Sequence, residues 1–168
     1  VASFPREGRE DIDEEQIFLL RLDAPASPES IRERAYCVIE GVSERVPLQV
    51  LQGDARKSVL AQRAALGYAY YNLLWKRGAY SSIRIRDRSL EHAENRIAVV
   101  QCNRRLPSAT QVRLVWGAGI ATAPNISAAT VNPVATINPG AAVNSSAPQP
   151  IETTQDQSLA FRVRPAFT

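Results

Sequence analysis

The alternating run QVRLVW ends at Trp116 and leads into Gly117-Ala118-Gly119, and these four residues are those whose types and spacing most suggest ligand chemistry. A glycine pair directly after a strand can cradle a phosphate. A dinucleotide site also needs the glycines to open a helix, and an acid about twenty residues further on. Here Pro124, Pro133 and Pro139 interrupt the stretch after the glycines, and its first acid is Glu152. We therefore expect no cofactor, and we expect the glycines to let a strand bend out of its sheet.

Cys37 and Cys102 are the only cysteines, and each sits in an apolar, strand-like run, AYCVIEG and VVQCNRRLP. Two cysteines outside any C-x-x-C pair cannot form a cysteine zinc site. They are either two separate buried thiols or a disulfide between strands. We favour the disulfide because both flanks are typical of core strands, and a disulfide implies an oxidising compartment.

The remaining polar groups do not form a catalytic pattern. His92, the single histidine, lies in the polar stretch SLEHAEN, and no serine lies in a G-x-S-x-G motif. Asp11, Asp13 and Glu15 are spaced as in a calcium loop, but the glycine of its sixth position is missing. We expect a solvated approach to the first strand, and neither a metal site nor an enzyme active site.

The charge pattern argues against a nucleic-acid partner. Twenty bases accompany seventeen acids, which leaves a net charge of +3. The one basic ribbon is SSIRIRDRS, where Arg84, Arg86 and Arg88 share a face. An exposed edge strand whose charged side chains prevent pairing with other strands has the same pattern, and we favour that interpretation over nucleic-acid binding.

The chain has 168 residues, which suits one domain with an insertion. No apolar run approaches the ~20 residues that span a bilayer, so we expect no membrane insertion. The start, VASFPREGRE, has no signal-peptide core. We expect the chain to be a piece of a longer protein.

Seven segments have the apolar or alternating pattern of strands, separated by turn residues: 16–25, 34–42, 46–53, 81–89, 96–102, 111–116 and 157–167. Short strands at this spacing predict a mainly β fold, an antiparallel immunoglobulin-like β-sandwich, formed by one domain over 1–168.

Residues 54–77 change to a helical period, with Val59, Leu66, Tyr70 and Leu73 on one face and Asp54 as the expected N-cap. We predict a helical insertion of one helix or two short ones. Its aromatics are either a binding surface or the face that seats the helix on the sandwich, and we favour the second. They are Tyr68, Tyr70, Tyr71 and Trp75.

Residues 121–155 are rich in Ala, Ser, Thr, Asn and Pro, which predicts a flexible low-complexity loop. The loop separates two strands that would otherwise form a hairpin. It carries two glycosylation sequons, at Asn125 and Asn144, which matter only in a glycosylating secretory pathway.

The stretch CNRRLPSATQVRLVWGAGIAT, with TTQDQSLAFRVRPAFT after the loop, resembles the N-terminal region of bacterial α-2-macroglobulins. In that family a Cys-x-Arg-Arg-Leu-Pro-like turn leads into a Val-x-Leu-Val-Trp-Gly strand. A Gln-x-Leu-x-Phe-x-Val-Arg-Pro-x-Phe strand then follows. FPREG and YCVIEG fit more loosely. The matching residues are Cys102, Arg104, Arg105, Leu106, Pro107, Leu114 to Gly117, Gly119, Ile120, Gln157, Leu159, Phe161, Val163, Arg164, Pro165 and Phe167.

The resemblance implies a macroglobulin-like sandwich within a large periplasmic parent, lipid-anchored to the inner membrane. Such parents are broad-spectrum protease inhibitors: a bait is cut, the molecule rearranges and the protease is caught. The family's thioester motif, Cys-x-Glu-Gln, is absent from this chain.

We therefore expect a non-catalytic structural domain without cofactors, whose partners are neighbouring domains and, through the parent, target proteases. The structural residues would be Trp116, Gly117, Gly119, Pro107, Phe161 and Pro165. The alternative is a stand-alone adhesion or scaffold module of the cell envelope.

Overall fold

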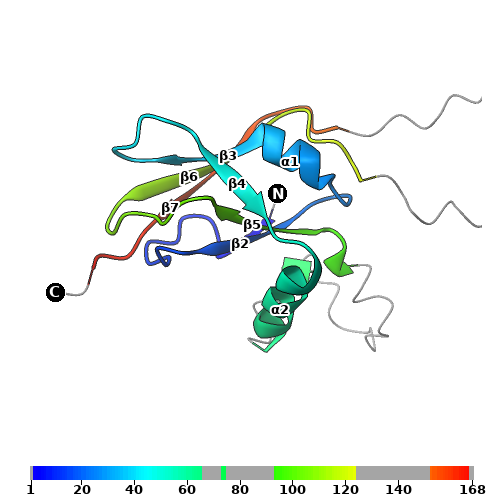
Figure 1. Ribbon diagram of the computed structural model, residues 1–168, viewed down its shortest axis with the longest axis horizontal. Coiled ribbons are helices and arrows are strands. Elements are labelled where there is room, and N and C mark those ends of the chain that lie inside the picture. The colour runs from blue at the N-terminus through cyan, green and yellow to red at the C-terminus, as the bar shows by residue number, and fades with distance from the viewer. Residues whose placement is uncertain (1, 66–72, 75–92, 124–151, 167–168) are drawn as a thin grey trace, which may run out of the picture.

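The computed structural model describes residues 2–65, 73–74, 93–123 and 152–166 (Figure 1). In order, its elements are β1 (Ala2–Phe4), β2 (Ile17–Arg21), α1 (Pro28–Arg34), β3 (Ala35–Ile39), β4 (Val46–Val50), α2 (Gly53–Ala64), β5 (Ile97–Cys102), β6 (Gln111–Trp116) and β7 (Gln157–Arg162). The predicted class, a mainly β antiparallel sandwich with a helical insertion, is confirmed.

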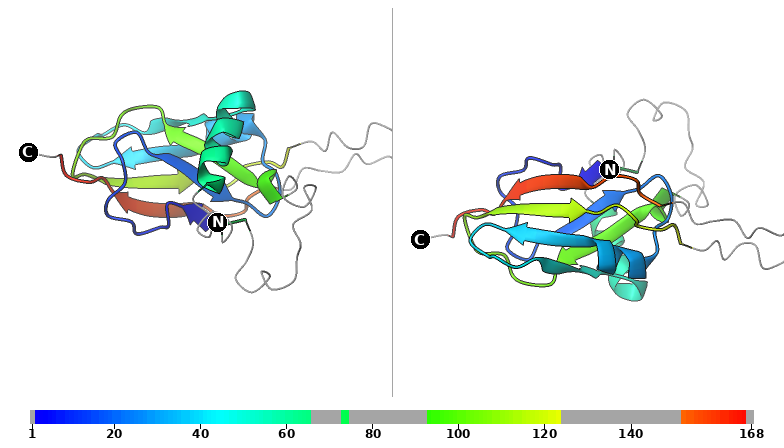
Figure 2. Two further views of the ribbon diagram at one scale, coloured as in Figure 1. Left: turned by 90° about the horizontal axis from the view of Figure 1, so that it is seen from below. Right: turned by 90° about the horizontal axis from the view of Figure 1, so that it is seen from above.

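The strands form one curled antiparallel sheet in the order β1-β2-β5-β4-β3-β6-β7. Its first four strands lie over its last three, as two views of the ribbon show (Figure 2). Lettered A to G along the chain, the two halves are A-B-E-D and C-F-G, which is the strand arrangement of immunoglobulin constant domains. The predicted hairpin partners, β6 and β7, pair along their whole length, with Trp116 opposite Gln157.

The core between the two halves follows from the alternation in β6 and β7. Val112, Leu114 and Trp116 point inward from β6, while Leu159 and Phe161 do so from β7. The ring of Phe161 lies 4.9 Å from that of Phe18 on the opposite half. The intervening residues are mostly exposed, so this half of the sandwich has one solvated face.

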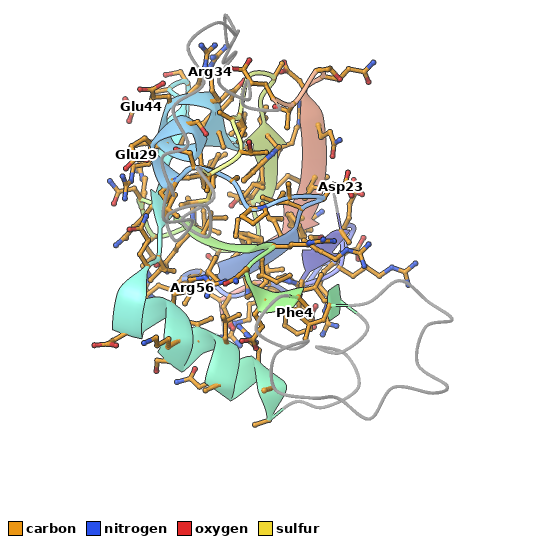
Figure 3. The ribbon with its side chains drawn as sticks, turned by 90° about the vertical axis from the view of Figure 1, so that its right-hand side faces the viewer. Phe4, Asp23, Glu29, Arg34, Glu44 and Arg56 are labelled. Carbon is orange, nitrogen blue, oxygen red and sulfur yellow. A yellow bond between two sulfur atoms is a disulfide. The ribbon has the colours of Figure 1, made fainter. Side chains whose placement is uncertain are left out.

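The strands β2 and β5 are buried on both faces, because α2 covers their outer side. Leu60 of α2 packs with Leu19, Ile97 and Val99, together with the helical residues Leu73 and Leu74. The Arg56 side chain ties α2 to the chain around β5, since its Nη2 donates to the carbonyl oxygens of Glu94 at 2.5 Å and Ile97 at 3.2 Å (Figure 3). Burial on both faces explains the unbroken apolar runs IFLL and IAVV.

The prediction for the start of the helical insertion was wrong. Gln52, in an extended conformation, is the N-cap, and Asp54 lies in the first turn of α2 without capping it. The helix begins at Gly53, which adopts a φ of +56°, and its N-cap lies two residues earlier than expected. The described helix ends at Ala64; residues 66–72 and 75–77 lie outside the described part.

Two elements were missed, and four strands were predicted too long: the segments 16–25, 34–42 and 46–53 contain β2, β3 and β4, of five residues each, and 157–167 contains β7. β1 has three residues, and α1 has seven, with Pro28 near its start and Ile31 as its buried residue. Both are too short to show a period. The predicted strand 157–167 ends at Arg162 and leaves Pro165 beyond it. The predicted strand 81–89 and His92 lie outside the described residues.

Candidate functional site

The glycine turn after β6 uses its own amides internally. The amide of Gly117 donates to the carbonyl oxygen of Arg34 at 3.0 Å, and that of Gly119 donates to the carbonyl oxygen of Thr153 at 2.8 Å. Between them, the amide of Ala118 donates to Oδ1 of Asp156 at 2.7 Å. A phosphate would have to displace three protein acceptors, one of them a carboxylate. The turn is therefore not built to cradle an anion.

Thr153 fastens this turn to the start of β7. Its hydroxyl donates to the carbonyl oxygen of Gly117 at 2.8 Å and accepts from the amide of Ile120 at 2.9 Å. Its own amide donates to the carbonyl oxygen of Ile120 at 3.1 Å. The side chain thus acts as a backbone substitute and holds β6 and β7 together where their ladder ends.

Both ends of the predicted loop 121–155 are paired. Isolated bridges join Ala121 to Glu152 and Thr122 to Ala26. Residues 124–151, with both sequons, lie outside the described part. The role of Thr153 and Asp156 in satisfying backbone groups was missed.

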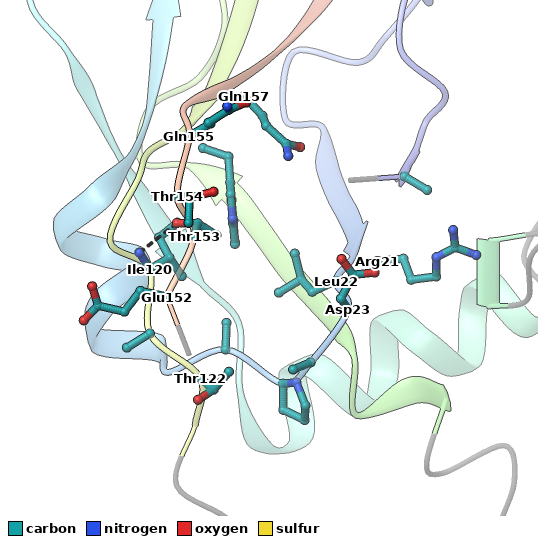
Figure 4. Close-up of a pocket in the computed structure, with 16 residues that line it drawn as sticks. Arg21, Leu22, Asp23, Ile120, Thr122, Glu152, Thr153, Thr154, Gln155 and Gln157 are labelled. Carbon is teal, nitrogen blue, oxygen red and sulfur yellow. Dashed lines mark hydrogen bonds between the residues drawn. The ribbon is translucent and has the colours of Figure 1, made fainter. Parts of the chain in front are cut away.

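A cavity of about 580 Å³ lies between this turn and the segment that leaves β2. Its apolar lining includes Trp116, Ile120, Leu22 and Pro25. In the close-up, Thr154 and Gln157 stand on one side and Leu22 and Asp23 on the other (Figure 4). Arg21 and Glu152 extend away from the centre. The cavity therefore joins an apolar floor to a mainly uncharged polar rim, which suits a peptide-like ligand.

Trp116 is the most unusual side chain of this cavity. It is 1% exposed, and its indole Nε1 is buried without a hydrogen-bond partner among the described residues. An unpaired buried donor costs about 1–3 kcal/mol, so such groups generally find an acceptor. The sequence predicted a structural role for Trp116, but gave no sign of the unpaired donor.

The structure has the favoured disulfide between Cys37 and Cys102, whose Cα atoms are 6.0 Å apart. Cys37 belongs to β3 and Cys102 ends β5, so the bond joins the two halves of the sandwich. Both residues are buried in the core.

The remaining residues of the resemblance are packing and turn residues. Leu106 is buried, and its amide donates to the carbonyl oxygen of Glu14 at 2.8 Å. Arg105 pairs with the Glu14 carboxylate, while the carbonyl oxygen of Pro107 accepts from the Thr110 hydroxyl at 2.6 Å. This turn positions the N-terminal approach to β2. Pro165 is exposed.

The acidic stretch before β2 is engaged in ion pairs. The hydrogen-bonded guanidinium of Arg9 holds the pKa of Asp11 below its usual value, and Asp13 pairs with Arg164 at 2.9 Å. Ile12 is buried and bridges to Val163, so the approach is solvated only at its acids. Among described residues, no group of three or more His, Cys, Asp or Glu side chains is placed to hold a metal.

The other sequence candidates lie outside the described residues: His92, Arg84, Arg86 and Arg88, and the aromatics of the helical insertion. Within the described part, no helix is both long and apolar enough to cross a membrane. Comparison with protein-family models, with curated proteins and with solved structures finds no match.

Proposed function

We propose that this chain is a non-catalytic structural domain of a bacterial α-2-macroglobulin. The parent is a broad-spectrum endopeptidase inhibitor that traps proteases in the periplasm and is lipid-anchored to the inner membrane. The domain itself packs against its neighbours in the parent chain and meets proteases only through that parent.

The observation that carries this proposal is the pairing of β6 with β7. The two halves of the resemblance are separated by the long loop in sequence, yet they lie side by side in register, with Leu114 opposite Leu159 and Trp116 opposite Gln157. Residues that match a family pattern and also face one another across one β-ladder must fit each other for the fold to form. This supports a macroglobulin-like module over a chance match of two short strings.

The places of the matching residues favour a structural role over a catalytic one. Leu114, Trp116, Leu159 and Phe161 are at most 5% exposed and point into the sandwich core. Leu106 is buried beneath the approach to β2. Side chains enclosed in this way stabilise the fold and are shielded from a substrate.

The disulfide supports the proposed location in the periplasm. A bond between Cys37 and Cys102 persists in oxidising surroundings such as the periplasm and is rare in the cytosol. The bond joins the two halves of the sandwich, so the domain gains its full stability only after export.

The inhibitory part of the proposal is tested with the native parent. An antibody against this chain would isolate the antigen from the envelope fraction, which is then incubated with trypsin and separated by size. We expect trypsin to co-elute with the antigen at high mass. Trypsin that elutes alone would contradict the trapping function. Trypsin inactivated at its active site beforehand is the control, because it cannot cut a bait.

A further inference from the structure

Described residues cover only half of the outer edge of β7. Its C-terminal half pairs with the segment 8–12, which runs parallel to it and forms an isolated bridge from Ile12 to Val163. Four backbone hydrogen bonds of 2.9–3.1 Å hold this added segment: Gly8 N to Ala160 O, Arg162 N to Arg9 O, Ile12 N to Arg162 O and Arg164 N to Ile12 O. This edge of β7 therefore already accepts an added strand.

Within the described part of the chain, the N-terminal half of the same edge has no such cover. Backbone groups alternate along a strand, and those of Ala160 and Arg162 face away from β6. The register of β6 and β7 is continuous, so the amide and carbonyl of Ser158 face the same way. Among described residues nothing pairs with these two groups or with the Ala160 amide.

This uncovered edge lacks the usual protection against strand addition. The residues from Gln157 to Ala160 include no proline, lysine or arginine, and Ser158 is exposed. Natural edge strands are blunted by charge, proline or bulges, and a plain edge is a template for pairing.

The edge opens on the cavity that contains Trp116. The cavity reaches from Ala2 on β1 to Gln157 on β7, so it lies between the two ends of the strand order. Both views of the ribbon show β1 beside β7 (Figure 2). Trp116, which lines this cavity, supplies a second, independent feature: its buried Nε1 is a donor for which the described residues provide no acceptor.

We propose that an extended segment of a partner protein adds to β7 at Ser158 as a further strand. Its backbone pairs with the amide and carbonyl of Ser158, continuing the line of the segment 8–12. An apolar side chain of the segment enters the cavity over Leu22 and Ile120, and a carbonyl oxygen accepts from the indole of Trp116. Strand addition of this kind gives affinity through the backbone and specificity through the pocket.

The cavity rim favours a segment without strong charge. Arg21 and Glu152 line the cavity but extend away from its centre, and its other polar side chains are mainly hydroxyls and amides, together with Asp23 (Figure 4). The inference depends on this geometry and not on membership of the macroglobulin family, so either can fail without the other.

The test uses the whole 168-residue chain and a displayed library of random short linear peptides. Selected peptides are titrated against the protein, and each amide of a peptide is methylated in turn. We expect binding to fall by about tenfold when the one amide that donates to the Ser158 carbonyl is methylated. The other amides should tolerate methylation.

Two substitutions at one position give a matched control. Ser158→Pro removes the outward amide and should weaken peptide binding about tenfold, whereas Ser158→Ala keeps the amide and should bind normally. The indole N–H resonance of Trp116, identified by comparison with Trp75→Phe, should move downfield on binding. The methylation series leaves the protein unchanged, so it decides the question even if Ser158→Pro does not fold.

Several results would overturn the proposal: a library that yields no binder, binders that are indifferent to Ser158→Pro, or binding that tolerates methylation at every amide. A concentration-dependent dimer that Ser158→Pro abolishes would also overturn it, because the occupant would then be a second copy of this chain.

Discussion

The amide of Gly117 donates to the carbonyl oxygen of Arg34 at 3.0 Å, and a β-carbon at Gly117 would collide with that same oxygen. Arg34 ends α1, and Gly117 comes directly after the last residue of β6. The glycine is needed here for close approach of two backbones, and the contact fixes α1 across the end of the sandwich.

Gly117→Ala should destabilise the domain by about 2 kcal/mol, because the obstructing atom is backbone and cannot move alone. A larger residue should cost more, so Gly117→Asn should be worse than Gly117→Ala. Urea denaturation followed by circular dichroism measures both. Equal stability of Gly117→Ala and the natural chain would refute the contact.

Gly119 provides the comparison, because its requirement is conformational. Its φ is +85°, and the nearest atoms to an added β-carbon are those of the Arg34 side chain at 3.7 Å or more. Gly119→Ala should cost about 1 kcal/mol, and Gly119→Asn less, since asparagine tolerates the left-handed region better. The order of alanine and asparagine should therefore reverse between the two glycines.

The disulfide should contribute substantially to stability. It closes a separation of 65 residues, for which the chain-entropy model gives about 4 kcal/mol. Protein made in an oxidising compartment should show no reactive thiol when denatured without reductant. Two thiols per chain would contradict the bond. Replacing both Cys37 and Cys102 by alanine should lower the free energy of unfolding by at least the entropic amount, because two buried side chains are also shortened.

The helical insertion should be an integral part of the core on its side of the sheet. Leu60 is 4% exposed and packs on Leu19 and Val99, so Leu60→Ala should cost about 3 kcal/mol. Ser58→Ala, at an exposed position of the same helix, should be neutral within about 0.5 kcal/mol. Equal effects of the two substitutions would mean that α2 does not pack on β2 and β5 in solution.

The stability at the start of α1 should depend on the protonation of Glu29. A backbone hydrogen bond and then the Ser27 hydroxyl, which donates to Glu29 Oε2 at 2.9 Å, hold the pKa of Glu29 below its usual 4.5. A lowered pKa in the folded state adds stability that is present above the unfolded value and lost as the pH falls through the folded value.

NMR titration of the Glu29 carboxyl should therefore give a midpoint below 4.5, and Ser27→Ala should raise it only part of the way, because the backbone bond remains. Ser43→Ala, at an exposed turn far along the chain, is the control and should leave the midpoint where it is. If Ser27→Ala leaves the midpoint unchanged, the Ser27 hydroxyl is not a cause of the lowered pKa of Glu29.

Local patterns carried most of the fold prediction. The alternation in β6 and the change of period at α2 are properties of a few adjacent residues, and they identified a sandwich with a helical insertion. β1 and α1 escaped because three residues, or a polar helix with Ile31 as its buried residue, show no such pattern. These two elements are stabilised by contacts with residues elsewhere in the chain.

The candidate site was predictable only in part, for the same reason. Trp116 and the two glycines stand out by type, but Asp156 and Thr153 satisfy backbone groups that lie more than thirty residues away. Composition placed Thr153 in the predicted loop 121–155, and Asp156 was left between that loop and the predicted strand 157–167. Likewise, no sequence pattern indicates that the described residues leave the Trp116 indole without an acceptor and the backbone of Ser158 without a partner, since both depend on how distant segments pack.

The central claim is that this domain belongs to a much larger inhibitor, and the size of the native product tests it most directly. An antibody against the chain would be used on the envelope fraction of the source organism, separated under denaturing and reducing conditions. We predict a band many times larger than 18.4 kDa. A band near 18.4 kDa would contradict the macroglobulin assignment and favour a stand-alone module of the cell envelope.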